Sequence, residues 1–375
     1  MQDQNRTLPS FLPNEASVLR LRALFEGRGY RKISLPRFED YSLLLDNKAF
    51  LGADRMVTFM DPTGKLLALR PDVTLSIAKK MPATELPAAE KLYYTDDVVR
   101  YAPDYHDYRV TEQIGIEFIG REDPFSGLEV LDIALKSLAI LGEETTMDVS
   151  HLGFVCGILC AAALPPRVEE AVLDAILAKN IHDLSGILNA AGVDSEHSER
   201  ILALAGLHGP FAQQLKKAGA LVRGPVMAEA FRELESIAAA IAPGPRQSLN
   251  LDFSVVGDLN YYNGLVFRGY IKDVSGVALG GGHYDNLMKK LGKQNTAIGF
   301  AVYLNRLDGY YADYTRQCDI LLIYPPNSDW RKLLIKVAEF ERQGLTVRCE
   351  LDGGDHSGIA HLRKIYYKDG GEADA

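Results

Sequence analysis

Cysteine is scarce in this sequence of 375 residues, and the chain lacks both a long apolar run and an excess of positive charge. The four cysteines are too few and too scattered for a disulfide framework, which fits a reducing cytoplasm. The polar start, residues 1–6, does not look like a signal peptide, and no apolar run approaches the roughly 18 residues that span a bilayer. We therefore expect a soluble, cytoplasmic, globular protein without a membrane partner.

The charge balance is acidic, with a formal net charge of −9 and a pI of about 5.5. No overall positive field attracts a polyanion, which disfavours a protein whose main function is to bind RNA or DNA. Cys156 and Cys160 lie four residues apart in an apolar helical run, without a histidine or a second cysteine pair at ligand spacing. They are expected to be small buried core residues rather than zinc ligands, so no metal site is predicted.

The segment over residues 254–267 has strand character at both ends and turn-forming residues in its middle, among them Gly257 and Asn263. This pattern predicts two strands joined by a polar bend lined with aromatic residues. Successive side chains on a strand point to opposite faces, so only one of Tyr261 and Tyr262 is expected to face the core or a pocket. An ordinary hairpin with two packed tyrosines also fits the pattern.

The N-terminal part predicts a helix over residues 13–27, a strand over residues 30–36 and a hairpin over residues 56–69. Pro71 and Asp72 then look like the first turn of a helix, where the fixed φ of proline and a negative charge near free N–H groups both help. Asp72 is therefore explained equally well as a helix-start residue and as a carboxylate that binds the amine of a ligand.

Two further strands are predicted on either side of a polar loop at residues 101–107. In the second strand Gln113 and Glu117 share one face, and Gly115 between them leaves space above the sheet. Such a polar face is usually solvated. Where a neighbouring strand brings Arg100 and a facing hairpin brings tyrosines, the same face forms the floor of a small polar pocket.

The rest of the chain contains a long helical region and a small C-terminal unit. Residues 124–242 are expected to be helical throughout, with no constellation of charged residues, as a helical insertion. Residues 277–288 indicate a strand, a triple-glycine turn and a helix, without the spacing of a phosphate-binding loop. Residues 296–307 indicate a strand that passes into a helix bearing Arg306, and residues 318–349 a strand, a helix and a strand.

These segments, in this order, resemble the catalytic core of class II aminoacyl-tRNA synthetases, and the histidyl-tRNA synthetases in particular. The first helix and strand, up to Pro36, resemble the first motif of the class, which builds its dimer; residues 91–120 resemble the second motif and residues 296–307 the third. The segments that resemble histidine-binding ones are Arg70-Pro-Asp-Val-Thr74, Gln113-Ile-Gly-Ile-Glu117, Leu259-Asn-Tyr-Tyr262 and Gly280-Gly-Gly-His-Tyr-Asp285.

The resemblance covers roughly residues 10–310 and implies an α+β fold, an antiparallel sheet flanked by helices. We expect a synthetase-like, histidine-binding domain over residues 1–315, with the helical insertion at about 124–245. Residues 316–375 are expected to form a small C-terminal α/β unit, too short for a complete anticodon-binding domain.

The resemblance also implies roles for individual residues. Four polar residues match positions that hold the amino and imidazole groups of histidine: Asp72, Thr74, Gln113 and Glu117. Three aromatic residues match the walls of that pocket: Tyr261, Tyr262 and Tyr284. Arg100, from the segment that resembles the second motif, adjoins the pocket. A cationic amine and an imidazole N–H both need anionic or amide acceptors in a closed site, which this set supplies. Asp72 stands where the synthetases usually have glutamate.

The sequence departs from the synthetase pattern on the side that binds ATP. Gly257 stands where these synthetases carry an arginine, a change that removes stabilisation of the negative charge that develops at the phosphate. The loop after Arg100 is shorter and lacks the expected arginines, and Asn305 replaces a usual glutamate, although Arg306 is kept. Adenylation of histidine is therefore expected to be lost, with no catalytic residues and no cofactor.

A chain that keeps a histidine pocket and loses activation resembles the regulatory subunits of ATP phosphoribosyltransferase, the first enzyme of histidine biosynthesis. That resemblance implies histidine as ligand and a homodimer that assembles with a short catalytic subunit in a hetero-oligomer, supports its activity and confers feedback inhibition by histidine. Two alternatives stay open: an active histidyl-tRNA synthetase, and a scaffold with a vestigial pocket.

Overall fold

The protein is described by a computed structural model over residues 13–46, 56–102, 106–121, 123–256, 261–307, 310, 318–368 and 371–374. The chain divides into two compact units, one of Arg20–Arg306 and one of Met1–Leu19 with Leu307–Ala375. Among the helices within the described ranges, none combines the length and the apolarity that a bilayer span requires.

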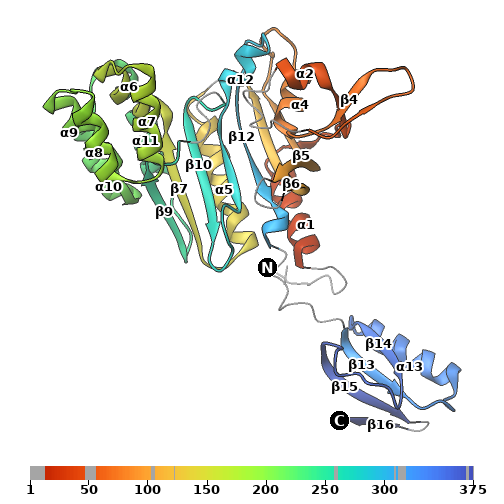
Figure 1. Ribbon diagram of the computed structural model, residues 1–375. Coiled ribbons are helices and arrows are strands. Elements are labelled where there is room, and N and C mark those ends of the chain that lie inside the picture. The colour runs from red at the N-terminus through yellow and green to blue at the C-terminus, as the bar shows by residue number, and fades with distance from the viewer. Residues whose placement is uncertain are drawn as a thin grey trace. The chain divides into compact units, whose positions relative to one another are not determined.

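A nine-stranded sheet forms the centre of the larger unit (Figure 1). In spatial order its strands are β1 (Arg31–Lys32), β5 (Glu90–Ala102), β6 (Asp107–Gly120), β12 (Thr296–Tyr303), β11 (Leu279–His283), β10 (Leu265–Ile271), β7 (Thr145–His151), β9 (Gln247–Asp252) and β8 (His208–Pro210). The pairs β1–β5 and β7–β9 are parallel and the others are antiparallel. The sheet is therefore mixed, and the predicted α+β class is confirmed.

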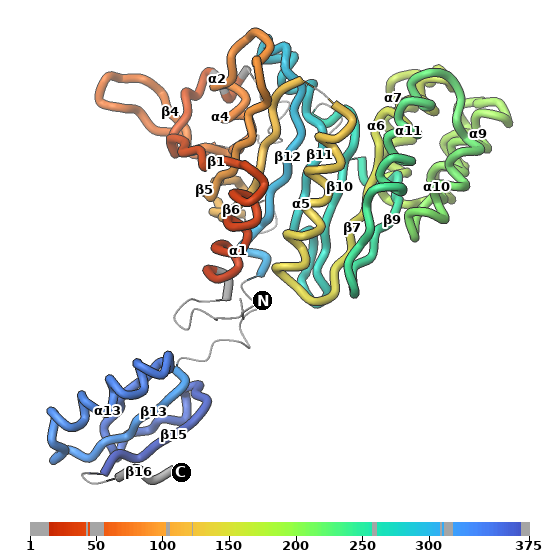
Figure 2. The backbone as a smooth tube through the Cα atoms, turned by 180° about the vertical axis from the view of Figure 1, so that it is seen from behind, coloured from red at the N-terminus to blue at the C-terminus, as the bar shows by residue number. Residues whose placement is uncertain are grey.

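Two helices cover one face of this sheet, as Figure 2 shows: α1 (Pro13–Gly27) and α5 (Ser126–Leu141). The rings of Tyr93 and Phe300 point to this side and lie 6.1 and 6.0 Å from the ring of Phe25 on α1, measured between centroids. Side chains alternate along a strand, so Tyr94 and Ala301 point to the opposite face, which α1 and α5 leave uncovered.

A three-stranded sheet and three short helices lie at one end of the large sheet. The strands, in spatial order, are β2 (Phe38–Asp40), β4 (Leu66–Leu69) and β3 (Thr58–Met60), and the helices are α2 (Tyr41–Asp46), α4 (Val73–Lys80) and α12 (Asp285–Lys290). The predicted hairpin is confirmed as β3–β4. Apolar side chains of α4 and α12, such as Ile77 and Leu287, share one buried cluster with Tyr94 of β5.

The insertion between β7 and β9 is helical. Its elements are α6 (Leu152–Ala162), α7 (Pro166–Leu177), α8 (Ile181–Ala190), α9 (Ser195–Ala205), α10 (Phe211–Ala218), the 3-10 helix η2 (Gly219–Leu221) and α11 (Gly224–Ala240). The expectation that residues 124–242 are helical throughout is wrong, because β7 and β8 interrupt them. Strand β7 pairs with both β10 and β9. These strands follow it much later in the sequence, so no local sequence pattern reveals the pairing.

Two other local predictions are corrected. The triple glycine, residues 280–282, forms no turn but lies within β11, where a Cβ on Gly281 would fall 2.2 Å from the carbonyl oxygen of Gly299 on β12. The predicted strand at residues 254–256 is absent, since β9 already ends at Asp252. Cys156 is half-buried and Cys160 exposed on α6, so neither is the fully buried core residue that was expected.

The C-terminal unit contains a second sheet of spatial order β14 (Val347–Leu351), β13 (Cys318–Tyr324), β15 (His361–Lys368) and β16 (Gly371–Asp374). Strand β13 is parallel to both of its neighbours, and α13 (Trp330–Arg342) connects β13 to β14. Leu333 and Phe340 of this helix pack on Ile320 of β13. The predicted strand–helix–strand order is confirmed, and β15 and β16 extend it.

Candidate functional site

A cavity of about 280 Å³ opens on the face of the large sheet that α1 and α5 leave uncovered. All eight residues predicted from the sequence line it: Asp72, Thr74, Arg100, Gln113, Glu117, Tyr261, Tyr262 and Tyr284. They come from the start of α4, from the neighbouring strands β5 and β6, and from two segments next to β10 and β11. The fold thus brings together side chains that are up to about two hundred positions apart in the sequence.

Small residues form the floor of this cavity. Gly115 on β6 stands opposite Ala301 on β12, which stands opposite Gly280 on β11. A Cβ on Gly115 would lie 2.7 Å from the hydroxyl of Tyr94, and a Cβ on Gly299 would lie 1.9 Å from Glu117 Oε2. Backbone carbonyl oxygens are close as well, Phe300 O at 2.2 Å from such a Cβ on Gly115 and Ile116 O at 2.4 Å from one on Gly299, so both positions require glycine.

Glu117 occupies the closed end of the cavity and is 1% exposed. Its Oε1 accepts a hydrogen bond of 2.7 Å from Thr74 Oγ1, and its Oε2 accepts one of 2.6 Å from Tyr284 Oη. Burial raises the pKa of Glu117 to about 8; the two hydroxyls oppose this rise and the negative charge of Asp72 adds to it. Within the part of the chain that the structure describes, both hydrogen bonds to this carboxyl come from neutral hydroxyls, and a ligand N–H can add a further donor.

Asp72 and Arg100 form the more open end. Asp72 Oδ1 caps α4 by accepting from the Leu75 N–H at 2.8 Å, while its Oδ2 accepts from Arg100 Nη2 at 3.0 Å. Arg100 Nε also donates to the carbonyl oxygen of Pro71 at 2.7 Å. Asp72 is therefore the N-cap of α4, and its second carboxylate oxygen faces the cavity side paired with Arg100; the helix begins at Val73, after both Pro71 and Asp72, which were expected in its first turn.

Three tyrosines form the aromatic wall. The ring of Tyr261 lies 4.8 Å from that of Tyr262 and 6.1 Å from that of Tyr284, measured between centroids. The prediction that only one of Tyr261 and Tyr262 faces a pocket is wrong. Residues 261–264 precede β10 and are not in a strand, so the alternation of faces does not apply to them.

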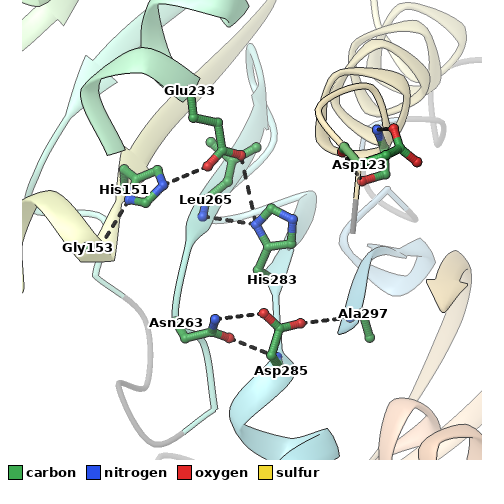
Figure 3. Close-up of polar contacts among 10 residues, drawn as sticks. Asp123, His151, Gly153, Glu233, Asn263, Leu265, His283, Asp285 and Ala297 are labelled. Atoms are coloured by element: carbon green, nitrogen blue, oxygen red, sulfur yellow. Dashed lines mark hydrogen bonds and ion pairs between the residues drawn. The ribbon is translucent and has the colours of Figure 1, made fainter. Parts of the chain in front are cut away.

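A pair of polar residues joins the two segments that carry these tyrosines (Figure 3). Asn263 Nδ2 donates to Asp285 Oδ2 at 2.8 Å, and the Asp285 N–H donates to Asn263 Oδ1 at 2.8 Å. Asp285 Oδ1 also accepts from the Ala297 N–H at 2.7 Å. The sequence indicated Asn263 only as a turn former and Asp285 only as the end of a segment that resembles a histidine-binding one, and did not predict that they pair; both directly follow wall tyrosines, Tyr262 and Tyr284.

A second carboxylate, which is half-buried, lies on the opposite face of the sheet from the cavity and near two histidines (Figure 3). Glu233 of α11 pairs through Oε2 with His151 Nε2 at 2.8 Å, and its Oε1 lies 4.0 Å from His283 Nδ1. Burial alone would raise the pKa of Glu233, but the hydrogen bond from His151 and the charges of both histidines lower it overall. The expectation of no charged constellation in residues 124–242 is therefore wrong.

Two further tyrosines, Tyr94 and Tyr303, line the cavity and were not predicted. For Tyr303 the alternation of β12 was an available signal, because Ala301 and Tyr303 share the face of the sheet that carries Gln113.

The residues of the altered ATP side are only partly described. Gly257 lies outside the described residues, as do residues 103–105 of the loop after Arg100. Asn305 and Arg306 belong to the 3-10 helix η3 (Leu304–Leu307), which stands where an α-helix was expected. Asn305 Oδ1 accepts a hydrogen bond of 2.5 Å from the Glu112 N–H of β6.

Comparison with known proteins gives a consistent result. Residues 7–307 match the family model described as Histidyl-tRNA synthetase. The chain is 32% identical to the ATP phosphoribosyltransferase regulatory subunit of Symbiobacterium thermophilum, over 79% of this chain and 76% of that protein. Its fold is similar to the structure of an ATP phosphoribosyltransferase regulatory subunit/histidyl-tRNA synthetase from Bacillus halodurans, with a TM-score of 0.74. That similarity covers 98% of this chain and 96% of the other, at 20% sequence identity. The fold is also similar to a chain of the ATP phosphoribosyl transferase (HisG:HisZ) complex from Thermotoga maritima, with a TM-score of 0.62 at 20% identity over 79% and 98% of the two chains.

Proposed function

From the premise that this chain belongs to the histidyl-tRNA synthetase family, and within it to the ATP phosphoribosyltransferase regulatory subunits, we propose a regulatory function. In this proposal the cavity binds histidine as a regulatory ligand. In this proposal the protein is not itself a catalyst. It supports the activity of a catalytic ATP phosphoribosyltransferase subunit and transmits feedback inhibition by histidine.

The observation that carries the proposal is the polarity of the cavity from one end to the other. The closed end offers Glu117 to the N–H of an imidazole ring, between tyrosine walls that fit the flat faces of that ring. The open end offers a carboxylate, Asp72, to an ammonium group and a guanidinium, Arg100, to a carboxylate. A free histidine molecule carries these groups in this order.

The volume of the cavity also favours a single amino acid. About 280 Å³ lies at the lower edge of the range of about 300–1,000 Å³ that is usual for pockets of drug-sized ligands. A histidine molecule fits such a space, whereas a nucleotide bound beside it requires more room.

Loss of adenylation is the second part of the proposal. It is supported by Gly257 in the place of an expected arginine, by the shortened loop after Arg100, and by Asn305, whose side chain is bonded to the backbone of β6. Removing one preorganised donor from a developing negative charge typically lowers the rate by about 100- to 1,000-fold. The runner-up, an active histidyl-tRNA synthetase, requires that other groups replace these contacts.

The partner is the third part. We propose a homodimer assembled with the short catalytic subunit of ATP phosphoribosyltransferase, without a nucleic-acid partner, which agrees with the net charge of −9. Histidine can regulate this assembly only by binding unequally to two of its arrangements.

Three measurements on one preparation test these parts. Titration calorimetry is expected to show histidine binding, with no binding of phenylalanine, which has a similar size but lacks ring nitrogens. Histidine-dependent exchange of pyrophosphate into ATP is expected to be absent, and the chain is expected to copurify with a phosphoribosyltransferase. Exchange at the rate of a synthetase would establish the runner-up, while absence of histidine binding would favour a scaffold with a vestigial pocket.

A further inference from the structure

Tyr303 closes the floor of the cavity at the end away from Glu117. It is the last residue of β12 and stands opposite Gln113, whereas Gly299, four residues earlier, stands opposite Glu117. At about 3.3 Å per residue, the two positions are about 13 Å apart along the strand. On β12 and β11 the floor between them carries the small residues Ala301 and Gly280, and Tyr303 is the bulky side chain that ends this stretch of β12.

The ring of Tyr303 lies over Gly280 of the neighbouring strand. A Cβ on Gly280 would be 3.3 Å from the Tyr303 hydroxyl and 3.8 Å from ring atom Cε2. On the far side of Gly280, Arg268 of β10 stands directly opposite it in the antiparallel register. Opposite residues of such a pair lie about 5 Å apart, so the ring covers the shortest route across the sheet from the cavity to Arg268.

Two arginines outside the cavity lining act on this ring, and one of them, Arg268, lies beyond it across Gly280. Of the described residues around the cavity, neither Arg268 nor Arg306 belongs to the lining, although both act electrostatically on the Tyr303 hydroxyl. Burial raises the pKa of Tyr303, and the cations Arg100, Arg268 and Arg306 oppose that rise. Asp148 of β7 stands opposite Arg268 and offsets part of its charge. The region beyond Tyr303 is therefore suited to an anionic group, and the ring separates it from the cavity.

We infer that Tyr303 is the specificity-determining residue that restricts this site to a free amino acid and excludes ligands extended at the carboxylate. The inference rests on the proposed histidine site, in which the imidazole lies at Glu117 and the carboxylate lies at the end formed by Arg100 and Tyr303. The excluded class comprises carboxyl-extended forms of histidine that carry a phosphate-like anion and a base, such as histidyl adenylate. A sensor that excludes them responds to the free amino acid alone.

The test compares two ligands on the full-length chain and its variants. The first ligand is histidine and the second is the non-hydrolysable sulfamoyl analogue of histidyl adenylate, both titrated calorimetrically. For wild type we expect histidine to bind at least tenfold more tightly than the analogue. For Tyr303→Ala we expect analogue affinity to rise at least tenfold, and the ratio of histidine affinity to analogue affinity to fall at least tenfold.

Tyr303→Leu provides a second variant that keeps an apolar side chain of intermediate length, and its analogue affinity should rise by an intermediate amount. Thermal melting identifies a variant that fails to fold. In that case the analogue affinity of the other variant tests the inference. Unchanged analogue affinity in a folded variant overturns the inference, as does a wild type that binds the analogue as tightly as histidine. Wild-type histidine affinity tests the proposed function separately, because the Tyr303 inference is judged on the rise in analogue affinity.

Discussion

Glu117, which is buried, and Glu233, which is half-buried, are two carboxylates on opposite faces of the large sheet, and their pKa values shift in opposite directions. Glu117 has two neutral hydroxyl partners, from Thr74 and Tyr284, and its pKa is raised to about 8. Glu233 contacts two imidazoles, those of His151 and His283, and its pKa is lowered. Burial acts on both groups in the same sense, so the partners make the difference.

The difference separates a binding group from a structural one. Glu233 already has nearby groups that can carry positive charge, and it joins α11 of the insertion to β7 and β11 of the sheet. Among the described residues, the hydrogen bonds to Glu117 come from the neutral hydroxyls of Thr74 and Tyr284, and Glu117 faces the cavity, so it is available to a ligand N–H. A buried carboxylate is therefore a candidate binding group when its neighbours leave its charge uncompensated.

The largest expected effect comes from replacing each ionisable carboxyl group by an amide of the same shape. Glu117→Gln should weaken histidine binding by roughly 100-fold, because a hydrogen bond to a charged group is worth about 1.5–3 kcal/mol in a buried site. Glu233→Gln is the matched control and should change histidine affinity less than threefold. Titration calorimetry on both variants measures the effects. Equal losses in the two variants would show that the comparison is wrong and that both carboxylates act through the fold.

The second prediction uses the opposite pH dependence of the two groups. The pKa of Glu117 is raised in the folded state, so the fold binds an extra proton between about pH 4.5 and 8 and loses stability as pH rises through this window. The maximum slope for one group is about 1.4 kcal/mol per pH unit. The stability of Glu117→Gln relative to wild type should therefore increase from pH 5 to 8.

The lowered pKa of Glu233 gives the reverse sign. The contribution of Glu233 to the free energy of unfolding is present above about pH 4.5 and is lost as pH falls through the lower pKa of the folded state. The loss of stability in Glu233→Gln relative to wild type should therefore shrink only in acid. Thermal melting of wild type and both variants at several pH values, without ligand, measures both trends. A difference between Glu117→Gln and wild type that stays constant from pH 5 to 8 would contradict the assignment of a raised pKa.

The smallest expected effect separates the two roles of Asp72. Asp72→Ser keeps a side chain that caps α4 but removes the charge facing Arg100 and the ligand amine. Histidine affinity should fall roughly tenfold, while the melting temperature stays close to that of wild type. Asp72→Ala should lose the cap as well, at a further cost of about 1 kcal/mol of stability. If Asp72→Ser binds histidine as wild type does, Asp72 is a cap alone.

Much of the site could be read from the chain because its chemistry is local in the sequence. Gln113 and Glu117 are an even number of residues apart on β6, so the alternation of side chains places both on one face of the sheet. Thr74 is in the first turn of α4, which could be recognised from its helix-start residues. Tyr303 and the pair Asn263–Asp285 were missed because their roles depend on which strands become neighbours. Likewise, β7 is a strand because β10 and β9 pair with it on both sides.

By itself the sequence determined the family and the α+β class, through its resemblance to known proteins, and eight of the residues around the cavity. Only the tertiary structure decided that Tyr261 and Tyr262 face the same cavity, that Glu117 is held by Thr74 and Tyr284, and that Glu233 is held by two histidines. The physical reason is that burial and charge compensation depend on partners brought together by long-range strand pairing. A carboxylate acquires its pKa, and with it its role, only when the fold supplies those partners.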